Sequence, residues 1–444
     1  MLPGAHEPST VHARRTGGSR ASDDRRESVD VDALEEGAAL LHTQLSATGQ
    51  EDTLQSTTKP TPATLNSSKT PSKILFLDGV RGLAAIFVVT QHSGYMGDVN
   101  LGACAVDIFF VLSSFLLTML FYRKSEMLIA QQASSRKWGF TLADYFSKRF
   151  FRVYPLFAAV AVVLWLMPDE AKKQYYLINT PEDYDLFKVL AFNFPSRYHV
   201  FWTLPLEIAY YFFIPVVVLS VISLGRGWWL PCVSLSVWIV HQGLYEYRTS
   251  HYPLAPHMPT FLSGSLAAIV FVKIDAASTK RGFQIRTWQK LVVRGCEACM
   301  LALLLSVCFQ GLLFDWVHAN PVPKALGFPY VSLLVTVLIV TEMLLPSPLA
   351  GVFEWNVLRY WGKISFSVYL LHSFVIYNDL VRGQMYYYDR LVSQFALVAL
   401  LSTASYHAIE YPSQLLSLKI SRALTQRERE GVERPPKDGI AFAA

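Results

Sequence analysis

The stretch FLDGVRGLAAIFVVTQH, Phe76 to His92, decides the class of this protein. It lies in an apolar segment that begins near Ile74 and has about the length, roughly 20 residues, that crosses a bilayer. The segment nevertheless contains Asp78, Arg81 and His92. Asp or Arg at mid-bilayer costs at least about 2.5 to 3.5 kcal/mol, so such groups indicate function or specific pairing inside a helix bundle.

Apolar segments continue through most of the remaining chain. Of its 444 residues, 52% are hydrophobic and only 16% are charged, against roughly 25% charged in soluble domains. Its ten Trp and 22 Tyr are typical of the aromatic belts at the two faces of a bilayer. We therefore expect an all-α, polytopic transmembrane helix bundle of about ten spans. The expected spans centre near Ala85, Val111, Val160, Phe213, Ser236, Leu266, Leu304, Val335, Leu371 and Leu400.

The chain divides into three parts by composition. Residues 1–72 are rich in Ser, Thr, Asp, Glu and Gly, which predicts a disordered cytosolic tail. Residues 73–415 hold the apolar segments, and residues 416–444 are charged and predict a short cytosolic tail. No signal peptide opens the chain, and basic residues cluster on the loops expected inside, so both termini are expected in the cytosol. Plasma membrane and internal membranes both stay open.

The net charge and the cysteines exclude several other classes of protein. A net charge of +5 is too small to predict nucleic-acid binding, because the basic residues cluster beside apolar segments. All five cysteines lie in apolar stretches, which predicts neither a disulfide framework nor a zinc site. Cys296 and Cys299 form a CxxC without a second pair or nearby histidines, so we expect them to pack and to bind no metal.

Arg81 and His92 are expected on one face of the first span. They are eleven positions apart, and eleven helical steps of about 100° return to within about 20° of the starting direction, about 16 Å along the axis. One groove could therefore hold both side chains. Asp78 precedes Arg81 by three positions, so a structural ion pair is the alternative for Arg81. For His92 the alternative is a packing histidine.

Two carboxylates are expected at the depth of His92. Asp107 lies early in the second span and Glu207 early in the fourth. Both spans run from outside to inside under the expected topology, which puts the two acids and His92 in the outer half of the membrane. A carboxylate beside an imidazole fixes its tautomer and raises its basicity, as a general base for a hydroxyl requires. Either acid alone could instead be a helix-packing residue.

Further polar groups are expected towards the cytosolic face. Lys148, Arg149 and Arg152 precede the third span. Arginine forks suit phosphate, although ordinary positive-inside flanking is the alternative. The ninth span adds His372 within the membrane, and the tenth span ends with Glu410 near the cytosolic face.

Six motifs, in order, resemble the integral-membrane acyltransferase 3 family, which includes bacterial polysaccharide and peptidoglycan O-acetyltransferases and many fungal members. The most specific is the pattern of Arg81, ten residues, then His92, and the resemblance runs from about Leu75 to Pro412. The other five motifs are VDIFFVLSSF, KRFFRVYP, FWTLPLEIAYY, GKISFSVYLLH and IEYP. Departures from the family pattern fall at Thr203, Pro205, Ser114 and Phe366.

The resemblance implies a membrane enzyme that takes an acyl group, commonly acetyl, from acyl-CoA bound from the cytosol. Acyl-CoA would be a co-substrate, with no permanently bound cofactor. His92 would be the catalytic base or acyl relay, with Arg81 beside the donor and Glu207 or Asp107 orienting His92. Lys148, Arg149 and Arg152 would hold the CoA phosphates. The candidate substrate-binding residues are Trp202, Tyr369 and His372.

The acceptor is expected to be a hydroxyl of a carbohydrate, a lipid or a secondary metabolite, and its identity stays open. Two other functions would use the same residues differently. In a proton-coupled secondary transporter the buried Arg, His and Glu would form a proton relay. In a non-catalytic scaffold or receptor they would only hold helices together. Besides the bilayer, acyl-CoA and the acceptor, no partner is expected.

Overall fold

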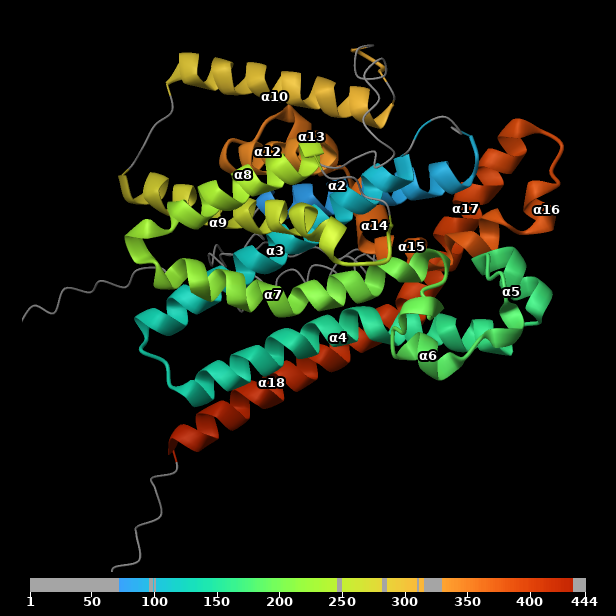
Figure 1. Cartoon of the computed structure of the whole chain (residues 1–444), viewed down its shortest axis with the longest axis horizontal. Coiled ribbons are helices and arrows are strands. Elements are labelled where there is room, and N and C mark those ends of the chain that lie inside the picture. Colours follow the sequence, from blue (N-terminus) through green and yellow to red (C-terminus); the bar gives the residue numbers. More distant parts are fainter. Residues whose placement is uncertain are drawn as a thin grey trace, which may run out of the picture.

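The computed structural model describes residues 72–95, 99, 101–245, 250–281, 286–309, 311–314 and 330–433. The described residues form helices and short connections, with no strand among them (Figure 1). Of the predicted N-terminal tail, residues 1–72, only Ser72 is among them, as the first residue of a helix. The α-helices are α2 (Ser72–His92), α3 (Leu101–Ala130), α4 (Ser135–Leu166), α5 (Asp169–Tyr176), α6 (Leu186–Leu190), α7 (Thr203–Ser223), α8 (Trp229–Tyr245), α9 (Met258–Arg281), α10 (Thr287–Cys308), α12 (Tyr330–Leu344), α13 (Pro348–Phe353), α14 (Asn356–Lys363), α15 (Ser365–Ile376), α16 (Asp379–Arg382), α17 (Tyr387–Ser405) and α18 (Tyr411–Glu433).

The prediction of an all-helical membrane bundle is confirmed, but the count of ten spans is not. All ten predicted span centres lie in helices. Among the described residues, six helical segments are long and apolar enough to cross a membrane, and Val331–Leu344 and Ser365–Ile376 are shorter apolar helices. The other four predicted centres lie in α2, α8, α12 and α15, which do not meet the length and composition of a spanning helix. The six segments are Leu101–Ala130, Ser135–Leu166, His199–Ser223, Ala255–Lys280, Thr287–Cys308 and Tyr387–Arg429.

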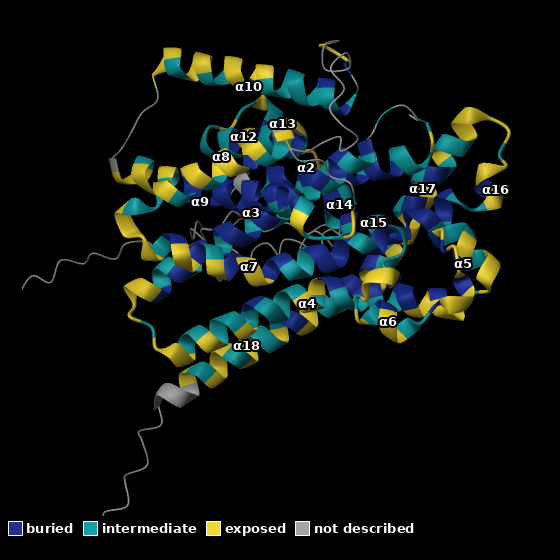
Figure 2. Cartoon of the chain, viewed as in Figure 1, coloured by how far each residue is buried: buried dark blue, intermediate teal, exposed yellow. Residues whose placement is uncertain are grey.

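Helix α3 is the central helix of the bundle and packs against α2, α7, α9 and α12. Figure 2 shows α3 mostly in the buried and intermediate colours, while the outer helices carry exposed residues on their outward faces. Buried hydroxyls join the central helices: Ser265 of α9 lies 2.8 Å from the Thr118 hydroxyl and 2.7 Å from that of Tyr210. Such contacts hold helices together where lipid supplies no hydrophobic drive. Exposed apolar side chains such as Phe212 and Leu400 then face lipid.

Glycines bring α2 into direct backbone contact with α13 and α14. A Cβ added to Gly82 would lie 1.9 Å from the carbonyl oxygen of Leu358, and one added to Gly362 would lie 2.0 Å from that of Asp78. Only a hydrogen side chain fits such an approach. The motif DGVRG thus fixes the position of α2, and with it the position of Arg81.

The C-terminal end of the bundle differs from the expected short tail. A π-helical turn, Tyr406–Glu410, joins α17 to α18, so the helix continues past Pro412 to Glu433. Pro412 reads as a helix end in the sequence because proline removes a helical hydrogen bond, but here the π-helical turn lies directly before it in the continuous helix. Figure 1 shows α18 running beside α4. Residues 434–444 lie outside the described residues.

Candidate active site

The bundle contains a cavity of about 100 Å³ between α2, α3, α4, α7 and α15. Four of the predicted catalytic and cofactor-binding residues line it, namely Arg81, Glu207, Arg149 and Arg152, and so does Tyr369. These residues come from four helices that are far apart in the sequence. Helix packing therefore brings the polar residues of four separate motifs to one place, named here the arginine cavity.

Arg81 is held by acids on either side of it. Its guanidinium lies 3.4 Å from the Asp78 carboxylate on the preceding turn of α2, so the ion pair considered from the sequence is present. It also interacts electrostatically with Glu207 and with Arg152. Arg81 therefore both pairs with Asp78 and lines the arginine cavity.

Glu207 lies in the arginine cavity, where Ser113 of α3 donates a 2.5 Å hydrogen bond to it. The sequence placed Glu207 at the depth of His92. In the structure the segment leading into α7 begins at His199, and eight residues at 1.5 Å each put Glu207 about 12 Å further along. Glu207 therefore interacts electrostatically with Arg81 instead of pairing with His92.

Arg152 has a second acidic neighbour that the sequence did not assign to the site. It interacts electrostatically with Glu410, which is buried in the π-helical turn and accepts a hydrogen bond from Ser367 of α15. It also interacts with Asp78. π-Helical turns are uncommon and recur at functional sites. The closing IEYP motif therefore contributes its acid to the region of the arginine cavity.

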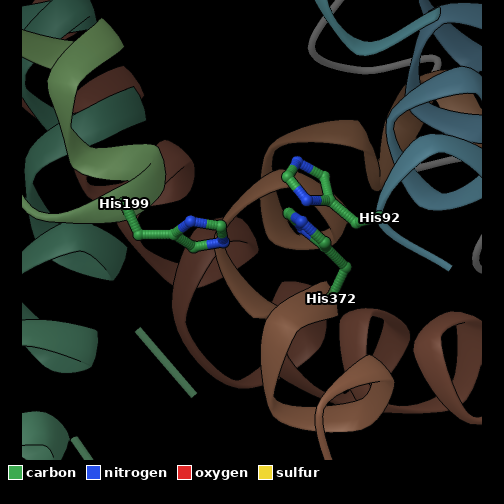
Figure 3. Close-up of side chains that lie close together, drawn as sticks. All are labelled: His92, His199 and His372. Atoms are coloured by element: carbon green, nitrogen blue, oxygen red, sulfur yellow. The ribbon is translucent and has the colours of Figure 1, made fainter. Parts of the chain in front are cut away.

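A second cluster, named here the histidine cluster, lies where α2 ends. His92 of α2, His199 before α7 and His372 of α15 place one ring nitrogen each within 4.8 Å of the others. Figure 3 shows the three rings converging from three separate elements. The ring centroid of His92 lies 4.9 Å from that of His372 and 5.3 Å from that of His199.

Each of the three rings of the cluster has a hydrogen-bond partner, and His199 Nε2 lies 2.8 Å from the Ser373 hydroxyl. His92 Nδ1 lies 3.2 Å from the Tyr377 hydroxyl. His372 Nδ1 donates to the carbonyl of Val368 at 3.0 Å, which leaves its buried Nε2 without a protein partner among the described residues. Burial raises the pKa of the Tyr377 phenol above its ordinary value, so Tyr377 is neutral at physiological pH and can either donate to His92 or accept from it.

The structure therefore differs from the expected pairing of His92 with Glu207 or Asp107. Among the described residues, the His92 ring contacts Tyr377, His199 and His372. Asp107 is fully buried in α3, and Glu207 lies in the arginine cavity. The other two histidines and a phenol, not a carboxylate, surround His92.

The remaining candidate residues lie elsewhere. Trp202 packs against Phe110 and His257, with ring centroids 6.3 and 5.3 Å away. Lys148 pairs with Asp144 at 2.9 Å and lines a separate cleft between α3, α4 and α18. That cleft measures about 860 Å³ and also holds Lys124 and Arg422.

The histidine cluster could also hold a metal ion, since imidazole is a common metal ligand. Three ligands on one tetrahedral zinc, each at about 2.1 Å, lie about 3.4 Å apart. The separations of up to 4.8 Å would have to shorten. The hydrogen bond from His372 Nδ1 to a carbonyl is of the kind that orients a ligating histidine.

Sequence reasoning missed His199, Tyr377 and Glu410 as members of these clusters. His199 and Tyr377 flank helices, where no helical period marks which side chains face inward. The available signal was a histidine two residues before the FWTLPLEIAYY motif. For Glu410 the signal was an acid inside an apolar helix end, which the topology placed merely near the cytosolic face.

Comparison with known proteins defines the class. The family described as an acyltransferase domain matches residues 74–404, which is well over half of the chain. The protein therefore belongs to this acyltransferase family, as the six motifs predicted. The match does not favour a transporter.

Individual relatives are distant. The chain is 23% identical over 395 residues to the O-acetyltransferase OatA of Staphylococcus aureus strain MRSA252, covering 82% of this chain and 61% of that protein. It is also 23% identical over 368 residues to "Putative O-acetyltransferase SACOL0978" of Staphylococcus aureus strain COL, covering 77% of this chain and 58% of that protein. The chain thus spans about three fifths of the length of these relatives. No solved structure gives a significant match.

Proposed function

We propose that the protein is a membrane-embedded O-acyltransferase that moves an acyl group, most simply acetyl, from acyl-CoA to a hydroxyl of a carbohydrate, lipid or secondary metabolite. The observation that carries the proposal is the pair of polar sites along α2, the arginine cavity around Arg81 and the histidine cluster around His92. Both lie inside an apolar bundle whose family is acyltransferase.

The donor enters from the cytosolic side, with both termini of the chain in the cytosol. Arg81, Arg149 and Arg152 are suited to the phosphates and the polar arm of CoA because guanidinium groups bind phosphate in a forked geometry. Ser113 already donates to Glu207, which leaves the guanidinium of Arg81 as the donor to the arm. Acyl-CoA is consumed in each turnover, so it is a co-substrate and not a resident cofactor.

His92 is the general base in this proposal. With its Nδ1 on Tyr377, its Nε2 accepts the proton of the acceptor hydroxyl while the oxygen attacks the thioester carbonyl. The carbonyl carbon gains a bond to the acceptor oxygen and loses its bond to sulfur. The proton then passes from His92 to the leaving thiolate, which gives the O-acyl product and free CoA. His199 and His372 hold the His92 ring in position.

The test is label transfer from radiolabelled acetyl-CoA in membranes that contain the full chain. His92→Ala and Arg81→Ala are compared with wild type, and with His241→Ala and Arg226→Ala as matched controls on exposed positions. Loss of label transfer is expected in the first two variants and not in the controls, with equal amounts of folded protein in all of them. General-base removal costs about 10²- to 10⁴-fold in rate.

Two outcomes would overturn the proposal. Unchanged transfer in His92→Ala would remove the base. Absence of both transfer and acyl-CoA binding in wild type, across extracts that contain varied hydroxyl compounds, would remove the function.

A further inference from the structure

A third cavity opens directly onto His92 at the end of α2. It measures about 370 Å³ and is lined by the His92 to Gly94 turn, by Ile376 and Tyr377 after α15, and by Arg382, Arg390 and Gln394. It lies on the side of His92 remote from Arg81, which stands eleven residues earlier on α2. A compound in this cavity would therefore reach His92 without passing the arginine cavity.

Two arginines make the cavity suitable for an anion. Arg382 ends α16, and its guanidinium lies 5.9 Å from the Tyr377 ring centroid. Arg390 lies in the first turn of α17, 5.6 Å from the Tyr95 ring centroid, and donates to the Tyr95 hydroxyl at 3.4 Å. Within the described part of the chain, no carboxylate forms an ion pair with either guanidinium. Both can therefore bind a carboxylate or phosphate of a ligand.

A buried amide supplies an independent sign of a polar ligand. Gln394 of α17 is 2% exposed and lines the cavity. Its side-chain oxygen has no hydrogen-bond partner among the described residues. A buried polar atom left without a partner costs about 1–3 kcal/mol. A ligand hydroxyl that donates to the Gln394 oxygen would remove this cost.

Exposed apolar side chains flank Arg382, one of the two arginines of the cavity. Leu380 of α16 is 85% exposed, and Met385 and Tyr386 of the following connection are 89 and 67% exposed. Apolar and aromatic side chains beside arginine are typical of the headgroup region of a bilayer. An acceptor that reaches this cavity can therefore arrive either from water or along the membrane surface.

We propose that the acceptor is a hydroxyl compound that carries a carboxylate or phosphate. Arg382 and Arg390 hold its anionic group, Gln394 accepts from one of its hydroxyls, and the reacting hydroxyl meets His92. This inference rests on the proposed O-acyltransferase function and narrows its substrate class. The anion can belong to an acidic sugar or to a lipid headgroup, and the experiment separates the two.

The first arm measures transfer from labelled acetyl-CoA with matched acceptors, using the full chain in detergent. Octyl glucuronide is compared with octyl glucoside, in which a neutral hydroxymethyl group stands in place of the carboxylate. Vesicles of phosphatidylglycerol, whose headgroup has free hydroxyls and a phosphate, are compared with vesicles containing a neutral galactolipid. The charged member of at least one pair is expected to react with a kcat/KM about tenfold to a hundredfold higher, the effect of one charge-assisted hydrogen bond.

The second arm removes the arginines. In Arg382→Gln and Arg390→Gln, the KM of the charged acceptor is expected to rise by about tenfold to a hundredfold, while the KM of acetyl-CoA stays unchanged. Lys188→Gln is the control, because Lys188 is an exposed cation of α6 outside the cavity. Equal use of charged and neutral acceptors, or an unchanged KM in both arginine variants, would overturn the inference and leave the proposed function intact.

A third arm decides the case in which no transfer is seen. Binding of octyl glucuronide, and of phosphatidylglycerol in nanodiscs, is measured without acetyl-CoA on wild type and on the arginine variants. Binding that requires both arginines supports the anion site even though the transferase function has failed. Binding equal in wild type and the double variant, or none at all, overturns it.

Discussion

Replacing Gly82 by alanine should push α2, which carries Arg81 and His92, away from α14. The new Cβ would lie 1.9 Å from the Leu358 carbonyl oxygen and 2.9 Å from the Gly362 nitrogen, both of them backbone atoms that cannot rotate away. Reaching even 3.0 Å, the lower limit of observed Cβ contacts, requires α2 and α14 to move apart by about 1.1 Å. Overpacking of this kind costs about 1–3 kcal/mol in unfolding free energy.

The same shift should reduce activity, because Gly82 follows Arg81 directly and shares its helix with His92. A misplacement of about 1 Å at reacting groups can lower a rate by about 10²-fold. The assays are thermal unfolding in detergent and label transfer from acetyl-CoA per folded molecule. Gly351→Ala is the control, since nothing lies within 4 Å of its added Cβ, and alanine there should stabilise helix α13 by about 0.5–1 kcal/mol. Indistinguishable behaviour of the two variants would refute the close approach of α2 to α14.

Three further outcomes are expected. Tyr377→Phe removes the hydroxyl 3.2 Å from His92 Nδ1 and should lower kcat by about twofold to tenfold with the KM of acyl-CoA unchanged, measured by steady-state transfer; an unaltered kcat would show that the phenol does not position the ring. Arg294→Met leaves the buried carboxylates of Glu297 and Glu342 without the cation that now contacts both and should cost about 3–5 kcal/mol, seen as a lower denaturation midpoint that neutral glutamines at the two acids restore. Dialysis against a chelator should leave transfer unchanged, because the proposed base needs an unligated ring nitrogen; activity lost and then restored by zinc would instead assign a metal to the histidine cluster.

The residues of the arginine cavity could be predicted because placing a charged side chain within the bilayer costs free energy. Arg81 and Glu207 stand out in apolar helices without any knowledge of the fold. Arg149 and Arg152 were predicted from the family motif KRFFRVYP. What the sequence could not give was the depth of each residue, since an apolar run does not reveal where its helix starts.

The surroundings of His92 could not be predicted for a different reason. His199 and Tyr377 belong to short connections, and connections carry no periodic pattern from which an inward face can be read. The arginines of the third cavity lie at helix ends, Arg382 at the end of α16 and Arg390 in the first turn of α17, and resemble ordinary loop charges. Their place in a cavity depends on the ends of α2 and α15 meeting the start of α17. That meeting is a property of packing between distant segments.

The arginine cavity and the cleft beside α18 differ in their balance of charge. In and around the arginine cavity, Arg81, Arg149 and Arg152 are matched by Asp78, Glu207 and Glu410. A balanced set orients a bound group but adds little long-range attraction. The cleft beside α18 differs, because five lysines and arginines there face only two acids.

On the proposed function, this difference assigns the two ends of acyl-CoA to separate regions. The phosphorylated nucleotide end fits the cleft, where excess positive charge attracts phosphate, and the thioester arm extends through the arginine cavity towards His92. Charges separated from their partner by water are screened within about 8–10 Å at physiological salt. Donor capture should then weaken with salt through the cleft cations, whereas the step at His92, enclosed by the bundle, should not. The proposed function thus extends the donor site to α18, which lies beyond the family match ending at residue 404.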